Sequence, residues 1–238
     1  MSSQHTLIVG GSSGIGLATA RHLLESGARV TITGRSETRL AEAKRNLGPD
    51  VQAIAMDATA ADALPAQFGK IGKFDHLVLA LGSGKGLGPF ASVSLADVKL
   101  SFEEKVYAHF ATAQAALPFL NPTGSLTFVS AVSAHAAAPG TAGIGSANAA
   151  VAALVPILAA ELKPIRVNGV SPGVIDTPWW DVFPDDQKQA MFETYAAKSP
   201  VGRVGRPEDV AKAIAFLIAD SFMTGHTLIC DGGLRLAA

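Results

Sequence analysis

Short apolar runs alternate along the chain with longer segments whose apolar residues recur at helical spacing. Leu7–Val9 is an apolar run that ends in glycine, and residues 14–26 follow it with apolar positions on one helical face. The β-branched run 30–33 and the segment 36–47, which Ser36 can cap, repeat this order. Strands that are apolar at consecutive positions and alternate with helices are typical of a parallel sheet covered on both faces.

The same alternation continues to the end of the chain. Further strands are predicted at 51–55, 76–80, 125–129, 166–170 and 228–230, and helices at 95–120, 144–162 and 207–220. No linker or repeat interrupts residues 1–238, so we predict a single α/β domain: a doubly wound, Rossmann-type parallel sheet of about seven strands. Residues 177–199 are the least regular stretch and carry both tryptophans, Trp179 and Trp180. We expect this segment to be a substrate lid.

Composition narrows the function classes. Hydrophobic residues make up 48% of the chain and charged residues 16%, so a large core is expected. The formal net charge of −1 gives no basic excess for nucleic acid or an anionic membrane. The single cysteine, Cys230, is expected to be a buried apolar residue. We see no signal peptide, no apolar stretch long enough to span a bilayer and no metal-ligand pattern, so we expect a cytoplasmic protein without a metal site.

A glycine-rich turn follows the first predicted strand and opens the first helix. Its sequence from 10 to 16 is GGSSGIG. Glycines at 10, 14 and 16 permit a tight turn and a close backbone approach, and a helix N-terminus binds a diphosphate. We therefore predict a dinucleotide site, although a glycine-rich βα turn can also be purely structural. The predicted contacts in the turn are Gly10, Ser12, Ser13, Gly14, Ile15 and Gly16.

The residues after the second and third strands indicate which dinucleotide is bound. An acidic residue after the second strand would bind the ribose hydroxyls of NAD, but this chain has Gly34-Arg35. An arginine favours a 2′-phosphate, so we predict NADP(H) rather than NAD(H). The alternative for Arg35 is a solvated surface charge. Asp57 and Ala58 follow the third strand, where they would meet the adenine; a turn or helix cap is the alternative for Asp57.

The chain resembles the short-chain dehydrogenase/reductase family nearly from end to end. Its glycine turn matches the family motif T-G-x-x-x-G-x-G, with Val9 in place of threonine. Further similarity lies at 114–118, 166–168, 171–177, 202–210, 224–225 and 231–233. The resemblance implies contacts with the carboxamide end of the cofactor at Pro172, Gly173, Val174 and Thr177, and with the nicotinamide ribose at Asn148. It also implies cofactor contacts after the fourth strand, at Ala80, Leu81 and Gly82.

The four catalytic side chains of that family are absent. In the family a tyrosine exchanges a proton with the substrate, a lysine lowers that tyrosine's pKa, a serine orients the carbonyl and an asparagine holds a relay water. Here Ile144 stands at the tyrosine position, Asn148 at the lysine position, Ala131 at the serine position and Lys105 at the asparagine position. Isoleucine and alanine cannot exchange protons, so the usual reaction loses at least the 10²–10⁴-fold rate typical of general acid catalysis.

Lysine and asparagine have exchanged places between the two helices. We hypothesise that Lys105 restores a positive charge near the nicotinamide ribose; the alternative is that it faces solvent or Glu104. His135 is a weak candidate for the proton donor, because a loop histidine is more often simply solvated. Tyr107 is not expected to share the pocket with Lys105, since it is two helical positions away. The other polar residues near the site are Ser130, Ser133 and Ser146.

Three functions fit these residues. The first is an NADP(H)-dependent oxidoreductase acting on a small carbonyl or alcohol with a rebuilt proton donor. The second is a catalytically silent protein that senses NADP(H) or another ligand, and the third is non-redox use of the same pocket. The resemblance also implies a homo-oligomer, either a dimer or a tetramer, whose partners are the dinucleotide and an unidentified small molecule.

Overall fold

A parallel sheet of seven strands forms the centre of the computed structural model, which describes residues 4–237. The strand order is β3-β2-β1-β4-β5-β6-β7, so the chain reverses direction across the sheet between β1 and β4. The strands are β1 His5–Val9, β2 Arg29–Gly34, β3 Gln52–Ala55, β4 Phe74–Leu79, β5 Leu120–Val129, β6 Arg166–Pro172 and β7 Thr227–Cys230. The predicted doubly wound α/β fold and its seven strands are confirmed.

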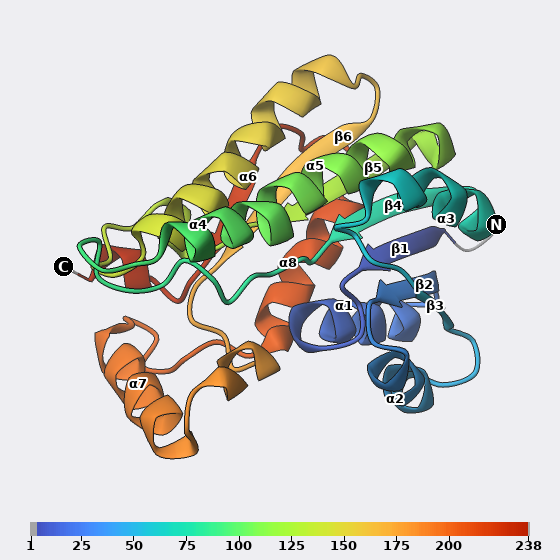
Figure 1. Ribbon diagram of the computed structural model, residues 1–238. Coiled ribbons are helices and arrows are strands. Elements are labelled where there is room, and N and C mark those ends of the chain that lie inside the picture. The colour runs from blue at the N-terminus through green and yellow to red at the C-terminus, as the bar shows by residue number, and fades with distance from the viewer. Residues whose placement is uncertain (1–3, 238) are drawn as a thin grey trace.

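Helices cover both faces of this sheet (Figure 1). On one face lie α3 (Leu64–Ile71), α4 (Leu95–Ser101), α5 (Ala108–Ala116) and α6 (Ala142–Glu161). On the other lie α1 (Gly14–Glu25), α2 (Glu37–Leu47) and α8 (Pro207–Ala219), and α1 packs directly against α8. The remaining helix, α7 (Asp185–Lys198), stands apart from both layers and has no buried residue.

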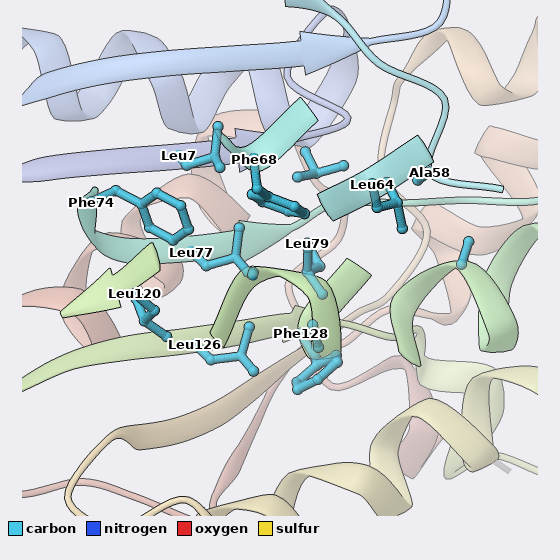
Figure 2. Packing of buried hydrophobic residues seen from close by; sticks show 14 of the residues in the cluster. Leu7, Ala58, Leu64, Phe68, Phe74, Leu77, Leu79, Leu120, Leu126 and Phe128 are labelled. Atoms are coloured by element: carbon cyan, nitrogen blue, oxygen red, sulfur yellow. The ribbon is translucent and has the colours of Figure 1, made fainter. Parts of the chain in front are cut away.

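The core is apolar on both sides of the sheet. Beneath α3 and α5, Leu7, Leu77 and Leu126 of three adjacent strands pack with Phe68 and Phe128 (Figure 2). A second cluster fills the space beneath α1 and α8, with Ile8, Ile32 and Ile214 among its members. These consecutive buried positions on β1, Leu7 and Ile8, serve opposite faces, which explains why the strands are apolar without alternation.

Two regions differ from the sequence prediction. Residues 177–199 were expected to be irregular, yet they contain the short 3₁₀ helix η5 (Pro178–Val182) and the fourteen-residue helix α7. The predicted helix 95–120 ends earlier, since β5 begins at Leu120, and it is interrupted by the π-helical turn η2 (Phe102–Tyr107). Such π turns are frequent at functional sites, and this one carries Lys105.

The expectation that no segment is long and apolar enough to cross a bilayer was wrong, because helix α6 is. Its twenty residues have a mean hydropathy of 1.7 over an 18-residue window, which meets that requirement by length and composition. In the structure α6 packs along β5 and β6 and against η2 and α4. Gly143, Ala147 and Val151 are buried on its inner side, so it forms part of the layer that covers the sheet.

Candidate dinucleotide site

The glycine turn is shaped by close backbone packing at the carboxyl end of β1. Gly10 has a φ of 85°, and a β-carbon there would collide with the carbonyl oxygen of Ala80. A β-carbon on Gly16 would collide with the carbonyl oxygen of Gly10. Side chains are therefore excluded where the turn meets α1 and the end of β4. The helix N-terminus beyond the turn directs free N–H groups to the edge of the sheet.

A cleft of about 280 Å³ opens at this edge, where the carboxyl ends of β1, β2, β3 and β4 meet. Nine of the predicted contacts line it: Gly10, Ser12, Ser13, Arg35, Asp57, Ala58, Ala80, Leu81 and Gly82. Eight do not: Gly14, Ile15, Gly16, Asn148, Pro172, Gly173, Val174 and Thr177. The cleft thus contains the residues after β2, β3 and β4 and the first part of the glycine turn, while Gly14–Gly16 and the loop after β6 lie outside it.

Two basic residues stand at the end of the cleft formed by β2 and α2. Arg35 and Arg39 are both exposed and both line the cleft with Ser36. The Ser36 hydroxyl caps α2 by accepting a hydrogen bond from the Arg39 backbone N–H at 3.3 Å. Positive charge from two guanidinium groups and from the helix N-terminus therefore converges there. Arg39 was not among the predicted contacts. The predicted cap at Ser36 places it in the first turn of α2, near Arg35, and this signal could have identified it.

Asp57 occupies the opposite wall, where it forms a turn and also faces the cleft. Its carboxylate accepts hydrogen bonds from the Thr59 backbone N–H at 3.0 Å and from the Thr59 hydroxyl at 2.7 Å, which is a turn-forming contact. It also lines the cleft. Burial raises the pKa of this carboxyl, but the bonds from Thr59 and the charge of Arg35 outweigh burial, so the pKa is lowered overall. Asp57 therefore carries a negative charge at neutral pH.

The loop that follows β6 is held by two C-terminal segments. The Gly173 N–H donates to the Cys230 carbonyl at 3.0 Å, and a β-carbon on Gly173 would lie 2.7 Å from the Asp231 Cα. Gly205 exchanges backbone hydrogen bonds with Val174 and Asp176, each at 2.9 Å. Three segments that each resemble a family motif, at 171–177, 202–210 and 231–233, are therefore in direct contact in the structure. Cys230 itself is half-buried rather than fully buried.

Lys105 points into the protein, which excludes the alternative that it faces solvent or Glu104. Its side chain is 6% exposed, and Nζ donates hydrogen bonds to the carbonyl oxygens of Leu81 at 2.8 Å and Val129 at 2.9 Å, with Ser130 at 3.5 Å. Burial lowers the pKa of Lys105 to about 7. Three surrounding oxygens that can only accept favour the protonated amine. Lys105 thus joins the carboxyl ends of β4 and β5.

Asn148 is the second half of the exchanged pair. It is 2% exposed, and its Nδ2 donates to the Ser133 hydroxyl at 3.2 Å and to the Ile144 carbonyl at 3.0 Å. Its Oδ1 is buried and has no hydrogen-bond partner. A buried acceptor without a donor costs about 1–3 kcal/mol. A ligand hydroxyl or a bound water would remove this cost, so Asn148 Oδ1 suits a donor such as a ribose hydroxyl.

The positions where the family has its proton donor carry no ionisable group. Ile144 and Ala131 are both half-buried, and the Ile144 N–H donates to the Gly86 carbonyl at 3.1 Å. His135 and Tyr107 are exposed, Tyr107 to 62%. Ser133 and Ser146 line a separate open hollow of about 530 Å³ whose other walls are mostly alanine, glycine and proline. Within residues 4–237, no group of three His, Cys, Asp or Glu side chains is placed to hold a metal.

Comparison with known proteins now identifies the family. The family described as Enoyl-(Acyl carrier protein) reductase matches residues 9–235. The chain belongs to the short-chain dehydrogenase/reductase family. Among its family relatives, cis-4-hydroxycyclohexanecarboxylate dehydrogenase of Sinomonas cyclohexanicum is 34% identical over 95% of this chain and 94% of its own.

Solved structures of the short-chain dehydrogenase/reductase family have the same fold. One is a small-chain dehydrogenase in complex with NADPH, with a TM-score of 0.84, 28% identity, and coverage of 99% of this chain and 100% of that one. Another is the MalC Reductase/Diels-Alderase of Malbranchea aurantiaca, with a TM-score of 0.87, 29% identity and coverage of 98% and 96%. Nucleotide binding is a property of this fold, since the family binds a nicotinamide dinucleotide.

Proposed function

We propose that this chain binds NADP(H) and does not follow binding with the proton transfer usual in its family. The observation that carries the proposal is the combination of Arg35 and Arg39 at the dinucleotide cleft with Ile144 and Ala131 at the proton-transfer positions. The arginines supply charge for a 2′-phosphate. The isoleucine and alanine leave a substrate oxygen without a proton donor.

The residues present fit the nicotinamide dinucleotide. The glycine turn leaves room for phosphates beside a helix N-terminus, and the unpartnered Asn148 Oδ1 can accept from a ribose hydroxyl. When bound, the nicotinamide supplies a hydride to a carbonyl carbon or takes one from an alcohol carbon. Among this chain's own residues, Lys105 fixes the carboxyl ends of β4 and β5 relative to each other. Its protonated amine places a positive charge beside those strand ends.

Binding and turnover test the proposal separately. In isothermal titration we expect NADPH to bind the wild-type chain at least tenfold more tightly than NADH. With a panel of small aldehydes and ketones, we expect NADPH oxidation to fall below family rates by about 10²–10⁴-fold. Rapid turnover of any of these carbonyls would overturn the silent-binding proposal and favour an oxidoreductase with a rebuilt proton donor. Failure to bind either dinucleotide would refute the proposal altogether.

The preference for NADPH should depend on Arg35. In Arg35→Asp we expect NADPH to bind roughly 10- to 100-fold more weakly, because a charge-assisted hydrogen bond to the 2′-phosphate is worth about 1.5–3 kcal/mol. NADH, which lacks that phosphate, should bind equally well or better. Arg45→Asp is the matched control, since Arg45 lies in the last turn of α2, the helix that follows Arg35, and does not line the cleft. An unchanged ratio of NADPH to NADH affinity in Arg35→Asp would contradict the assignment.

A second candidate function is non-redox chemistry in the open hollow. The hollow of about 530 Å³ is lined mainly by small apolar residues and offers only Ser133, Thr141 and Ser146 as hydroxyl groups. Such a surface selects an apolar ligand by shape. The similar MalC is named both a reductase and a Diels-Alderase, which supports the idea that one fold can serve both chemistries. Ligand-dependent product formation without NADPH consumption would favour this candidate.

We also propose that the chain forms a homodimer or homotetramer. Apolar side chains project from η2, α5 and α6: Tyr107 is 62% exposed, Phe110 50% and Ile157 58%. Light scattering should give a mass of two or four times the chain mass of 24.4 kDa. The variant Ile157→Asp should have a lower mass. Val182→Asp is the control, because Val182 is exposed on η5 rather than on these helices. A wild-type monomer would refute this proposal.

A further inference from the structure

A strap formed by residues 177–179 joins the glycine turn to the loop after β4, beside the dinucleotide cleft. At one end, Thr177 packs on the glycine turn: a β-carbon on Gly14 would lie 3.3 Å from Thr177 Cβ and Cγ2. At the other end, the Trp179 ring lies over the loop after β4, since a β-carbon on Gly82 would lie 3.9 Å from its Cδ1. The Trp179 Nε1 donates to the Ser83 carbonyl oxygen at 2.9 Å. The strap therefore connects the ends of β1 and β4.

The residue that holds Trp179 is itself firmly fixed. Ser83 is 5% exposed, and its hydroxyl donates to Glu104 Oε2 at 2.7 Å while accepting from the Lys85 N–H at 3.1 Å. Glu104 lines the cleft. A hydrogen-bonded chain thus runs from the indole of the strap through Ser83 to a carboxylate on the cleft wall. This anchor was not visible in the sequence, where Trp179, Ser83 and Glu104 are far apart.

The cleft beside the strap is smaller than a typical ligand pocket. Its volume is about 280 Å³, below the roughly 300–1,000 Å³ typical of pockets for drug-sized ligands. Arg35, Asp57 and the glycine turn form its walls. Of the described residues in the loop 172–177, none lines it. The loop to which the family assigns the nicotinamide therefore lies outside the cleft, and its last residue, Thr177, begins the strap.

The strap belongs to a unit that lies outside both core clusters. Trp180 packs with Phe183, Phe192 and Tyr195, with ring centroids 5.6–6.3 Å apart, and this cluster joins η5 to α7. Helix α7 has no buried residue and lies away from the two helical layers (Figure 1). The bond between Trp179 and Ser83 is a polar contact that ties this unit to the loop after β4.

We propose that Trp179 sets the length of ligand that the cleft accepts. With the strap closed, the cleft takes adenosine that carries phosphates at its 2′ and 5′ positions, and complete NADP(H) binds after Trp179 leaves Ser83. This inference rests on the proposed function, since it assumes that the cleft is the dinucleotide site. A ligand that binds only the open form has an apparent Kd raised by the inverse of the open fraction. Trp179 therefore weakens NADP(H) more than the shorter nucleotide.

Isothermal titration with NADPH and with adenosine 2′,5′-bisphosphate tests this gate. In Trp179→Ala the Kd for NADPH should fall about three- to tenfold, which corresponds to the loss of one hydrogen bond and its ring contact. The Kd for the bisphosphate should not change. Trp179→Phe keeps a ring and loses the N–H, so it should give a smaller gain of the same sign. Val182→Ala is the matched control, because Val182 lies in the same helix η5 and its side chain is 70% exposed.

The possible outcomes distinguish failure of the Trp179 gate from failure of the proposed NADP(H) binding. Weaker NADPH binding in Trp179→Ala, or equal changes for both ligands, would overturn the gate and leave NADP(H) binding intact. A wild-type chain that binds neither ligand would refute the proposed function, whatever the strap does. Circular dichroism checks the fold of each variant. If Trp179→Ala does not fold, the ratio of the two Kd values in Trp179→Phe decides between these outcomes.

Discussion

Restoring the family's side chains should produce a carbonyl reductase. The variant Ala131→Ser/Ile144→Tyr/Asn148→Lys/Lys105→Asn is expected to reduce small ketones with NADPH about 10²–10⁴-fold faster than the wild type. A tyrosine hydroxyl would return the missing proton donor, and a serine hydroxyl would return the group that orients the carbonyl. The gain depends on an intact cofactor site, which the wild-type geometry of the glycine turn and the cleft provides.

Lys105 must be changed together with Asn148. Helix α6 packs against η2, and both residues are almost fully buried. A lysine at 148 with Lys105 still present would place two buried amines close together, and like charges lower each other's pKa. We therefore expect the triple variant that retains Lys105 to be less stable and less active than the quadruple one. The action of Lys105 on the cofactor stays a prediction, which the NADPH affinity of the single variant Lys105→Ala tests.

The matched control replaces tyrosine with phenylalanine. Ala131→Ser/Ile144→Phe/Asn148→Lys/Lys105→Asn has a ring of similar size at 144 and no hydroxyl. Initial rates of NADPH oxidation for the two variants, measured at saturating NADPH, isolate the proton donor from changes in packing. If the phenylalanine and tyrosine variants had equal rates, the missing hydroxyl would not be the reason for low activity in this chain.

Stability should fall steeply below pH 6.5, the ordinary pKa of histidine, because buried histidines stay neutral in the folded chain. Burial lowers the pKa of His76 to about 4, against a smaller opposing effect of Asp75. Burial lowers that of His109 to about 3, with Lys105 adding to the effect. The unfolded chain takes up these protons near pH 6.5 and the folded chain does not. The stability that these two neutral histidines contribute is therefore fully present above pH 6.5. It is lost as the pH falls toward 4 for His76 and toward 3 for His109.

The size of this loss follows from the pKa differences. His76 alone contributes about 3 kcal/mol between pH 6.5 and 4, at about 1.4 kcal/mol for each pKa unit. Guanidinium denaturation at several pH values measures it. In His76→Leu the slope of unfolding free energy against pH should decrease by up to one proton in this window. His135→Leu, at an exposed histidine, should keep the wild-type slope. Equal slopes for all three proteins would contradict the assignment of His76.

The sequence predicted those parts of the fold that depend on local pattern. The alternation of apolar strands with amphipathic helices, and the glycine turn between β1 and α1, both follow from residues close together in the chain. Helix α7 escaped prediction because it buries no residue and so has no apolar face. The π turn η2 escaped because a change in backbone hydrogen bonding leaves no pattern of residue types.

The candidate site was predictable where it follows the ends of strands. Arg35 and Asp57 come directly after β2 and β3, and both line the cleft. The direction of the Lys105 side chain was not predictable, because it depends on carbonyl oxygens of β4 and β5 that are distant in sequence. The contact of Trp179 with Ser83 likewise joins residues 96 positions apart.

The glycine turn has a consequence for how such a chain can evolve. Side chains at Gly10 and Gly16 are excluded by neighbouring backbone oxygens of the same protein, with or without a ligand. Selection for folding alone therefore preserves the glycine motif in a lineage that has stopped using the cofactor. Arg35 and Arg39 are exposed, and the fold does not require their charge. In a lineage that loses cofactor binding, substitutions should therefore appear at these two arginines before they appear at the glycines.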